Sequence, residues 1–232
     1  FDTLYTYDYL ARPSKIVPRA AESLPQVSDD GRTWTIKVRK GVRFADDPAF
    51  GGKARELTAD DFVYSIKRLI DPKIRSPWAF LVEGKLVGLD EVAEQAKKTG
   101  KFDYDRKVPG IEAVDRYTVR FRLKETDYNL PYILAHEPTS AVAREVIEKY
   151  AESDGRAQAN PVGTGPYRLA KWVRSSKISL EANPHYRGFT WDFAPTDPAD
   201  AAVIREMKGK SMPQVGRVEI SIIEEDQARL LA

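Results

Sequence analysis

The stretch that decides the fold is Val27-Ser28-Asp29-Asp30-Gly31-Arg32-Thr33-Trp34-Thr35-Ile36-Lys37-Val38-Arg39-Lys40-Gly41-Val42-Arg43-Phe44. Its first residues are typical of a turn, because aspartate side chains bond nearby backbone donors and Gly31 can take a positive φ. From Thr33 onward apolar and polar residues alternate, which places Trp34, Ile36 and Val38 on one face of a strand. The stretch therefore predicts a turn that leads into a half-buried strand.

A second strand of the same kind is predicted from Tyr117 to Leu123, where alternate residues are again apolar. Between the two strands the sequence predicts a helix that begins after Thr58. Thr58 is a good N-cap, and Asp61 follows it three residues later, as in a capping box. Phe62, Ile66 and Leu69 then form one apolar stripe, and the helix is expected to end at Asp71-Pro72.

Weaker patterns predict the remaining elements. Helices are expected over residues 90–98, ended by Gly100, and over residues 141–150, with Val142, Val146, Ile147 and Tyr150 inward. The acidic-then-apolar end, 224–232, is typical of a helix start. Further strands are expected over residues 167–172, 177–180 and 218–222.

Two long irregular segments interrupt this mixed α/β pattern, one over residues 45–57 and one over residues 187–215. Both are rich in proline or glycine and are longer than ordinary connections in a compact domain. We therefore expect them to be functional or peripheral insertions, whose roles the sequence does not name.

Composition excludes several classes of function. The chain has 232 residues, 42% of them hydrophobic and 31% charged, and a formal charge of only +2, so no global field favours nucleic acid. The basic residues of 37–43 alternate with apolar ones, as on the solvated face of a strand. Cysteine is absent, which removes disulfides and thiol nucleophiles, and no apolar run is long enough for a membrane span.

No constellation of catalytic or metal-ligating residues is present. The chain has two histidines, and it lacks both the Gly-x-Ser-x-Gly and the His-Glu-x-x-His patterns. Paired carboxylates such as Asp60-Asp61 and Glu224-Glu225 are adjacent in sequence, so on a helix they point in different directions. We therefore expect no enzyme activity, no cofactor and no metal, although a hydrolase remains a less favoured alternative.

Several long motifs resemble, in the right order, those of solute-binding protein family 5, which includes oligopeptide-, dipeptide- and nickel-binding proteins. They are Ile16-Val17-Pro18-Arg19-Ala20-Ala21-Glu22-Ser23, the opening stretch above, Leu57-Thr58-Ala59-Asp60-Asp61-Phe62-Val63-Tyr64-Ser65, Asn160-Pro161-Val162-Gly163-Thr164-Gly165-Pro166-Tyr167-Arg168-Leu169 and Leu180-Glu181-Ala182-Asn183-Pro184-His185-Tyr186. Members of that family are much longer, so the chain is similar to their N-terminal part.

This resemblance implies a periplasmic-binding-protein type II-like α/β fold with mixed sheets and an accessory small lobe. Residues 1–140 would form the accessory lobe and residues 141–232 an incomplete part of the first ligand-binding lobe, while the second main lobe would be absent from this chain. It also implies a periplasmic or extracytoplasmic location. The partners would be a peptide or other small solute and an ABC transporter permease, with a membrane reached only through the permease or an upstream lipid anchor.

Five residues are candidates for ligand contact. Trp78, after Ser76-Pro77, lies on a loop where an aromatic either fills the core or faces a ligand. The family resemblance favours the ligand-facing role for Trp78 and suggests one for His136, which could equally be a structural imidazole. Gly163-Thr164-Gly165 allows close backbone approach, in a ligand-facing loop or in a tight structural turn.

The identity of the ligand stays open among oligopeptide, dipeptide, nickel chelate and other solutes. A second function is also compatible with the same fold, namely the ligand-sensing domain of a transcription regulator. A DNA-binding helix-turn-helix in the natural gene would favour that alternative.

Overall fold

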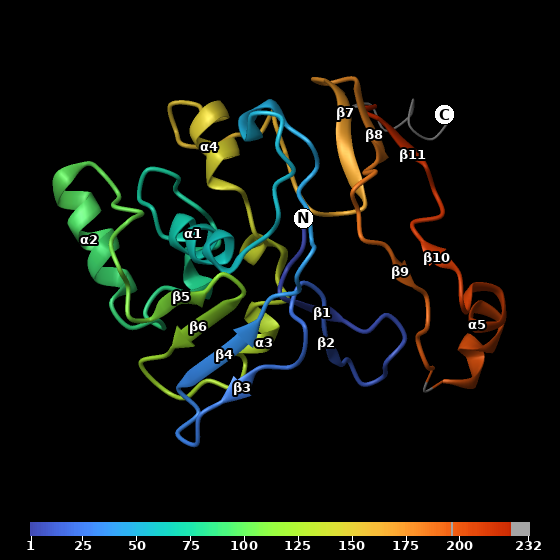
Figure 1. Ribbon diagram of the computed structural model, residues 1–232, viewed down its shortest axis with the longest axis horizontal. Coiled ribbons are helices and arrows are strands. Elements are labelled where there is room, and N and C mark those ends of the chain that lie inside the picture. Colours follow the sequence, from blue (N-terminus) through green and yellow to red (C-terminus); the bar gives the residue numbers. More distant parts are fainter. Residues whose placement is uncertain (196, 224–232) are drawn as a thin grey trace.

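The computed structural model of the protein describes residues 1–195 and 197–223. Figure 1 shows the N-terminal two thirds as a body of helices and a sheet, with the C-terminal strands beside it. The strands form four antiparallel sheets, one of four strands, one of three and two of two. Together with five α-helices in the described residues they confirm the mixed α/β class expected from the sequence.

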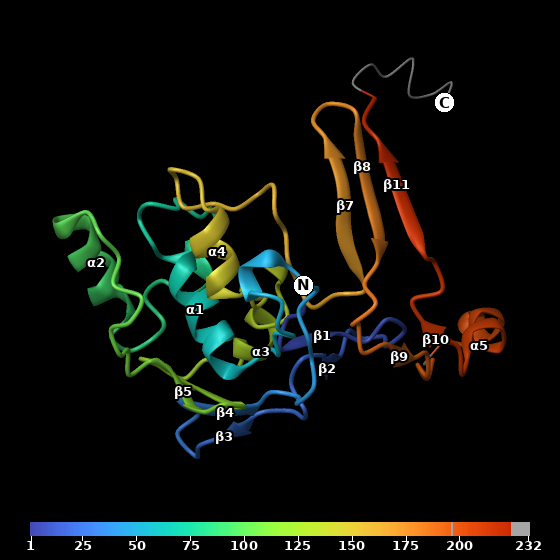
Figure 2. The ribbon, with the colours of Figure 1, turned by 45° about the horizontal axis from the view of Figure 1, so that its top comes forward.

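The four-stranded sheet forms one side of the body and has the order β3-β4-β6-β5 (Figure 2). Its strands are β3 (Gln26–Val27), β4 (Thr33–Lys37), β5 (Ile111–Asp115) and β6 (Thr118–Arg122). Trp34 lies opposite Phe121, and Ile36 opposite Val119. All four side chains are buried, as the alternation predicted, and burying each stabilises the fold by about 1.5–3 kcal/mol.

Helix α1 (Ala59–Leu69) covers the buried face of this sheet. Its start is the predicted one, because the Asp61 carboxylate accepts hydrogen bonds from the Thr58 backbone N–H at 2.7 Å and from the Thr58 hydroxyl at 3.1 Å. Phe62 and Ile66 are buried against the sheet. The same Asp61 carboxylate pairs with Arg55 at 2.7 Å, and Arg55 also pairs with Glu145 at 2.8 Å, so one cluster joins α1 to the later chain.

Helix α2 (Leu89–Thr99) ends at Gly100, whose φ of 72° and N–H bond to the Ala96 carbonyl match the predicted glycine stop. Helices α3 (Leu130–Ile133) and α4 (Arg144–Tyr150) follow. The prediction that the last of these begins at Ala141 was wrong. The Ala141 and Val142 N–H groups donate to the Asp2 carbonyl and to the Ser65 hydroxyl, so this segment is fixed in extended form.

The three-stranded sheet has the order β11-β8-β7 and stands apart from the body in Figure 2. It consists of β7 (Tyr167–Val173), β8 (Lys177–Ala182) and β11 (Arg217–Ser221). Leu169, Leu180 and Val218 are cross-strand neighbours on one face. The other face is charged, with pairs such as Lys177–Glu219 at 2.7 Å.

The segment between β8 and β11 has more structure than the predicted irregular insertion. It contains β9 (Phe189–Thr190), a 3₁₀ turn at Pro198–Asp200, α5 (Ala201–Met207) and β10 (Ser211–Met212). Strands β9 and β10 pair in antiparallel fashion and form a short ribbon. The ribbon lies beside the hairpin of β1 (Tyr5–Tyr7) and β2 (Ile16–Pro18) in both ribbon views.

The other long segment, residues 45–57, holds a 3₁₀ turn at Pro48–Phe50 and is closed by a backbone bridge between Arg43 and Glu56. The helix predicted over residues 224–232 lies outside the described residues. No helix in the described part of the chain is both long and apolar enough to cross a membrane.

Candidate solute-binding surface

Trp78 lies on the surface, at the end of the loop that follows α1. The Ser76 hydroxyl accepts a hydrogen bond from the Trp78 backbone N–H at 3.2 Å, and the Trp78 carbonyl accepts one from Leu81 in the next 3₁₀ turn. These bonds fix the backbone while the side chain leaves the core, because Trp78 is 40% exposed. A core-filling role for this ring therefore does not fit the structure.

His136 meets Trp78 from a second segment of the chain. The two ring centroids are 5.3 Å apart, with an interplanar angle of 42°. His136 caps the 3₁₀ turn Glu137–Thr139, where its carbonyl accepts a hydrogen bond from the Thr139 hydroxyl at 2.8 Å. The imidazole itself is exposed, so the structure brings together two of the predicted site residues on one accessible surface.

Further exposed aromatic rings lie on the same two segments and on β1, and the sequence analysis did not find them. The Phe80 ring is 6.0 Å from Trp78 and 60% exposed. Tyr132, four residues before His136, lies 6.2 Å from the ring of Tyr7 on β1, and both are about half exposed. We call Trp78, Phe80, His136, Tyr132 and Tyr7 the aromatic surface. Aromatic faces of this kind bury large areas when they meet a partner or ligand.

Gly163-Thr164-Gly165 packs against the N-terminal residue of the chain. A Cβ on Gly163 would lie 2.9 Å from the Phe1 ring, and one on Gly165 would lie 2.9 Å from the Phe1 backbone nitrogen. Further along the chain, the Tyr5 N–H donates a hydrogen bond to the carbonyl of Leu134, two residues before His136. These glycines thus permit close packing, and their contact with a ligand stays a prediction.

Two polar contacts complete this segment. The Gly165 carbonyl accepts a hydrogen bond from the Asn183 side-chain amide at 2.9 Å, which ties it to the turn after β8. The Thr164 side chain is 1% exposed, and its hydroxyl has no hydrogen-bond partner within the described residues.

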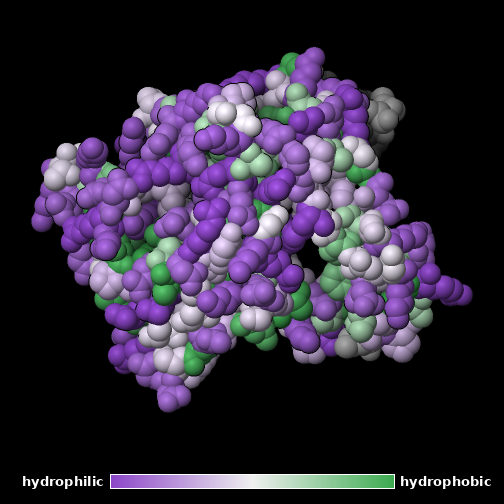
Figure 3. Space-filling view, viewed as in Figure 1, coloured by the Kyte–Doolittle hydropathy of each residue, from purple (hydrophilic) through white to green (hydrophobic). Residues whose placement is uncertain are grey.

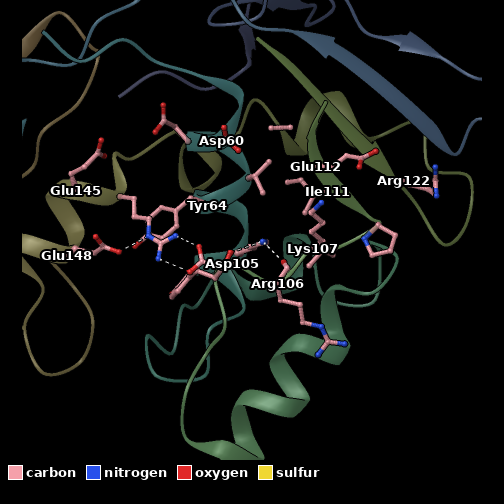
Figure 4. Close-up of a pocket in the computed structure, with 18 of the residues that line it drawn as sticks. Asp60, Tyr64, Asp105, Arg106, Lys107, Ile111, Glu112, Arg122, Glu145 and Glu148 are labelled. Atoms are coloured by element: carbon pink, nitrogen blue, oxygen red, sulfur yellow. Dashed lines mark hydrogen bonds and ion pairs between the residues drawn. The ribbon is translucent and has the colours of Figure 1, made fainter. Parts of the chain in front are cut away.

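A charged hollow of about 900 Å³ lies away from the aromatic surface, between α1, α4 and the 104–113 segment (Figure 4). Six basic and six acidic residues line it, and six of these twelve charged residues pair with one another. Arg144 bonds to Asp105 and pairs with Glu148 at 2.6 Å, and Arg55 pairs with Asp61 and Glu145. Because the ion pairs neutralise each other, this hollow presents little uncompensated charge, and we do not assign the binding site to it.

Comparison with known proteins identifies the family. The family model for bacterial extracellular solute-binding proteins, family 5 Middle, matches residues 15–232. The chain belongs to this family. It is 33% identical over 200 residues to the periplasmic oligopeptide-binding protein OppA of Escherichia coli K12, covering 84% of this chain and 32% of that protein. It is also 26% identical to the dipeptide-binding protein of the same strain, covering 93% of this chain and 39% of that one.

Solved structures show the same fold. The pheromone receptor PrgZ, described with its mode of peptide binding, superposes with a TM-score of 0.70 at 22% identity, over 100% of this chain and 38% of that one. The unliganded open form of the murein tripeptide-binding protein MppA gives 0.67 at 26% identity, over 100% and 37%. The family 5 type II-like fold is therefore confirmed, and the chain spans a little over a third of these neighbours.

Proposed function

We propose that the protein captures a peptide-like solute outside the cytoplasm and delivers it to the permease of an ABC importer, without catalysing a reaction. The observation that carries this proposal is the Trp78–His136 pair, two accessible rings 5.3 Å apart that come from separate segments. Its relatives are named for binding oligopeptides and dipeptides, which supports a peptide-like solute.

The aromatic surface suits such a ligand physically. Flat rings contact side chains of varied size through dispersion and apolar burial, while backbone groups of an extended peptide find polar partners at strand edges. Strand β1 lies next to Tyr132, so its backbone and the rings face the same region. We propose that Gly163, Thr164 and Gly165 border this region from the other side of residues 1–5.

We further propose a division into lobes, with residues 1–140 as the accessory lobe and residues 141–232 as part of the first ligand-binding lobe. Binding would then shift an equilibrium between open and closed lobes, and the closed form would dock on the permease. The four-stranded and three-stranded sheets are separate, which supports this division.

The test uses the natural full-length protein. Native mass spectrometry identifies the solute that co-purifies with it, and calorimetry then measures the affinity of that solute for wild type and four variants. Trp78→Ala and His136→Ala should each weaken binding. The double variant should lose less binding free energy than the sum of the two single losses, because the two rings are in contact. Tyr128→Ala is the control, since Tyr128 is exposed but packs against Trp34. Unchanged affinity in both site variants would refute this placement of the site.

A further inference from the structure

A second hollow, of about 690 Å³, lies between the β1–β2 hairpin and the segment that carries β9. In the space-filling view the surface is hollowed between the body and the C-terminal segments (Figure 3). Tyr7 lines this hollow and also contacts Tyr132 of the aromatic surface. The hollow therefore shares Tyr7 with the aromatic surface.

Three arginines line the hollow, and a buried carboxylate holds two of them in place. Asp2 is fully buried, and its two carboxylate oxygens pair with Arg19 and Arg187, each at 2.7 Å. The Arg187 side chain also donates to the Arg19 carbonyl at 3.2 Å. Because Asp2 faces both arginines, it leaves one of their charges uncompensated.

Arg39 is the third arginine and has no carboxylate within ion-pair distance among residues 1–195 and 197–223. Its Nε donates to the Arg19 carbonyl at 3.2 Å, which fixes the guanidinium at the rim of the hollow. This bond uses one of its five N–H donors and leaves the two terminal nitrogens available. Within the described residues, exposed Asp192 is the one acidic residue that lines the hollow, and buried Asp2 lies behind two of the arginines, so two aspartates balance three arginines.

Aromatic residues of the segment around β9 also line the hollow. Phe193 packs at 6.2 Å from Tyr9, at 6.4 Å from Phe189 and at 5.2 Å from buried Trp191. Phe189 is 46% exposed at the lining. A guanidinium without an ion pair, in a hollow that aromatic rings also line, is suited to a group that carries a carboxylate next to an apolar body.

We propose that this hollow is a carboxylate subsite of the solute-binding surface, in which Arg39 binds the carboxylate and Phe189 and Phe193 contact the adjoining apolar group. The inference rests on the proposed function for the identity of the ligand as a peptide. The carboxylate could be the C-terminus of a peptide or an acidic side chain, since both offer the same acceptor pair.

The first test needs no peptide. In the natural full-length protein, freed of bound solute, NMR titration measures the affinity of 3-phenylpropionate and of the neutral 3-phenylpropionamide. We expect the acid to bind at least tenfold more tightly than the amide, and Arg39→Gln to remove that difference. Arg43→Gln is the matched control, because Arg43 is an exposed arginine of the same stretch that lies outside the hollow.

The second test locates the carboxylate in a peptide. Calorimetry compares Ala-Ala-Phe as free acid and as C-terminal amide, and then the amides of Ala-Glu-Phe and Ala-Gln-Phe, each with wild type and Arg39→Gln. If C-terminal amidation lowers the affinity for wild type but not for Arg39→Gln, the subsite binds the C-terminal carboxylate. A preference for Glu over Gln, in wild type alone, assigns it to a side chain.

The outcomes separate this inference from the proposed function. If the peptides bind but neither charge nor Arg39 affects their affinity, the subsite is overturned and the proposed function stands. If 3-phenylpropionate binds through Arg39 while no peptide binds, the subsite stands and the peptide proposal fails. Equal binding of acid and amide with no effect of Arg39→Gln overturns the subsite directly, and melting temperatures of the variants check that each one is folded.

Discussion

At the scale of single residues, one tryptophan of this chain is expected to stabilise the fold and another to bind the solute. Trp34 is 3% exposed in the core, whereas Trp78 is 40% exposed on the aromatic surface. In the full-length protein we expect Trp78→Ala to weaken solute binding by about 1–3 kcal/mol and to change stability little. Trp34→Ala should cost about 3–5 kcal/mol of stability by opening a cavity.

Urea unfolding and binding titrations on the same two variants check this contrast. A strongly destabilised Trp78→Ala protein whose folded fraction binds normally would return Trp78 to a structural role.

The residue scale also shows what spacing along a chain could predict. Trp78 was proposed from its loop position and the family resemblance, but its contact with His136, 58 residues away, follows from no local pattern. Tyr7 and Tyr132 were missed because they lie on elements of three and four residues, which are too short to show a period. Tertiary packing alone brings these rings together.

At the scale of elements, the start of α1 depends on one buried carboxylate. Asp61 is 2% exposed, accepts from Thr58 and pairs with Arg55. Asp61→Ala should therefore cost on the order of 3 kcal/mol, because it removes the cap and breaks a largely buried ion pair. Equilibrium denaturation measures the loss.

The neighbouring Asp60 is exposed and has no such contacts in the described chain, so Asp60→Ala serves as the control. Equal effects of the two substitutions would contradict the role given to Asp61.

Glu56 should make the stability of the protein depend on acid pH. The Gly41 N–H, at 2.6 Å, and then the Tyr117 hydroxyl and Arg116 hold the pKa of this carboxyl below its usual 4.5. A depressed pKa in the folded state means that the stabilisation is present above pH 4.5 and is lost as the pH falls through the lower folded value.

With Glu56→Gln, the melting temperature should fall less steeply than in wild type as the pH is lowered from 6 to 3. If the melting temperature of the variant fell as steeply with decreasing pH as that of wild type, the Glu56 contacts would not persist in solution.

Alternating strands and a well-capped helix were predictable because their signals are local. The two central strands and α1 appear within two residues of their predicted positions. The error at α4 has a physical cause, since the N–H groups of Ala141 and Val142 find partners in Asp2 and Ser65, which are distant in sequence. Contacts of this kind override helix propensity and leave no mark in the nearby sequence.

At the scale of the whole molecule, the chain covers about a third of its oligopeptide-binding relative. One wall of a cleft desolvates only one side of a ligand, so we expect the isolated chain to bind the solute far more weakly than the full-length protein. Calorimetry of both proteins with the co-purified solute checks this. Equal affinities would contradict binding between two lobes.

Folding is not expected to require a metal. Within the described residues no group of three or more His, Cys, Asp or Glu side chains could hold an ion. A chelator should therefore leave the melting temperature unchanged. A large decrease would reveal an oxygen-ligand site formed elsewhere in the protein.

The ribbon of β9 and β10 has a consequence for how this protein could diversify. Thr190 and Ser211 are directly paired, so the chain leaves the ribbon and returns to it at neighbouring points. A two-residue Asn-Gly turn could thus replace residues 191–210 without altering the pairing of β8 with β11. At the end of that strand pair the Ala182 N–H donates a hydrogen bond to the Gly216 carbonyl at 2.8 Å. The length and sequence of this segment can therefore vary while the strands that carry it keep their pairing.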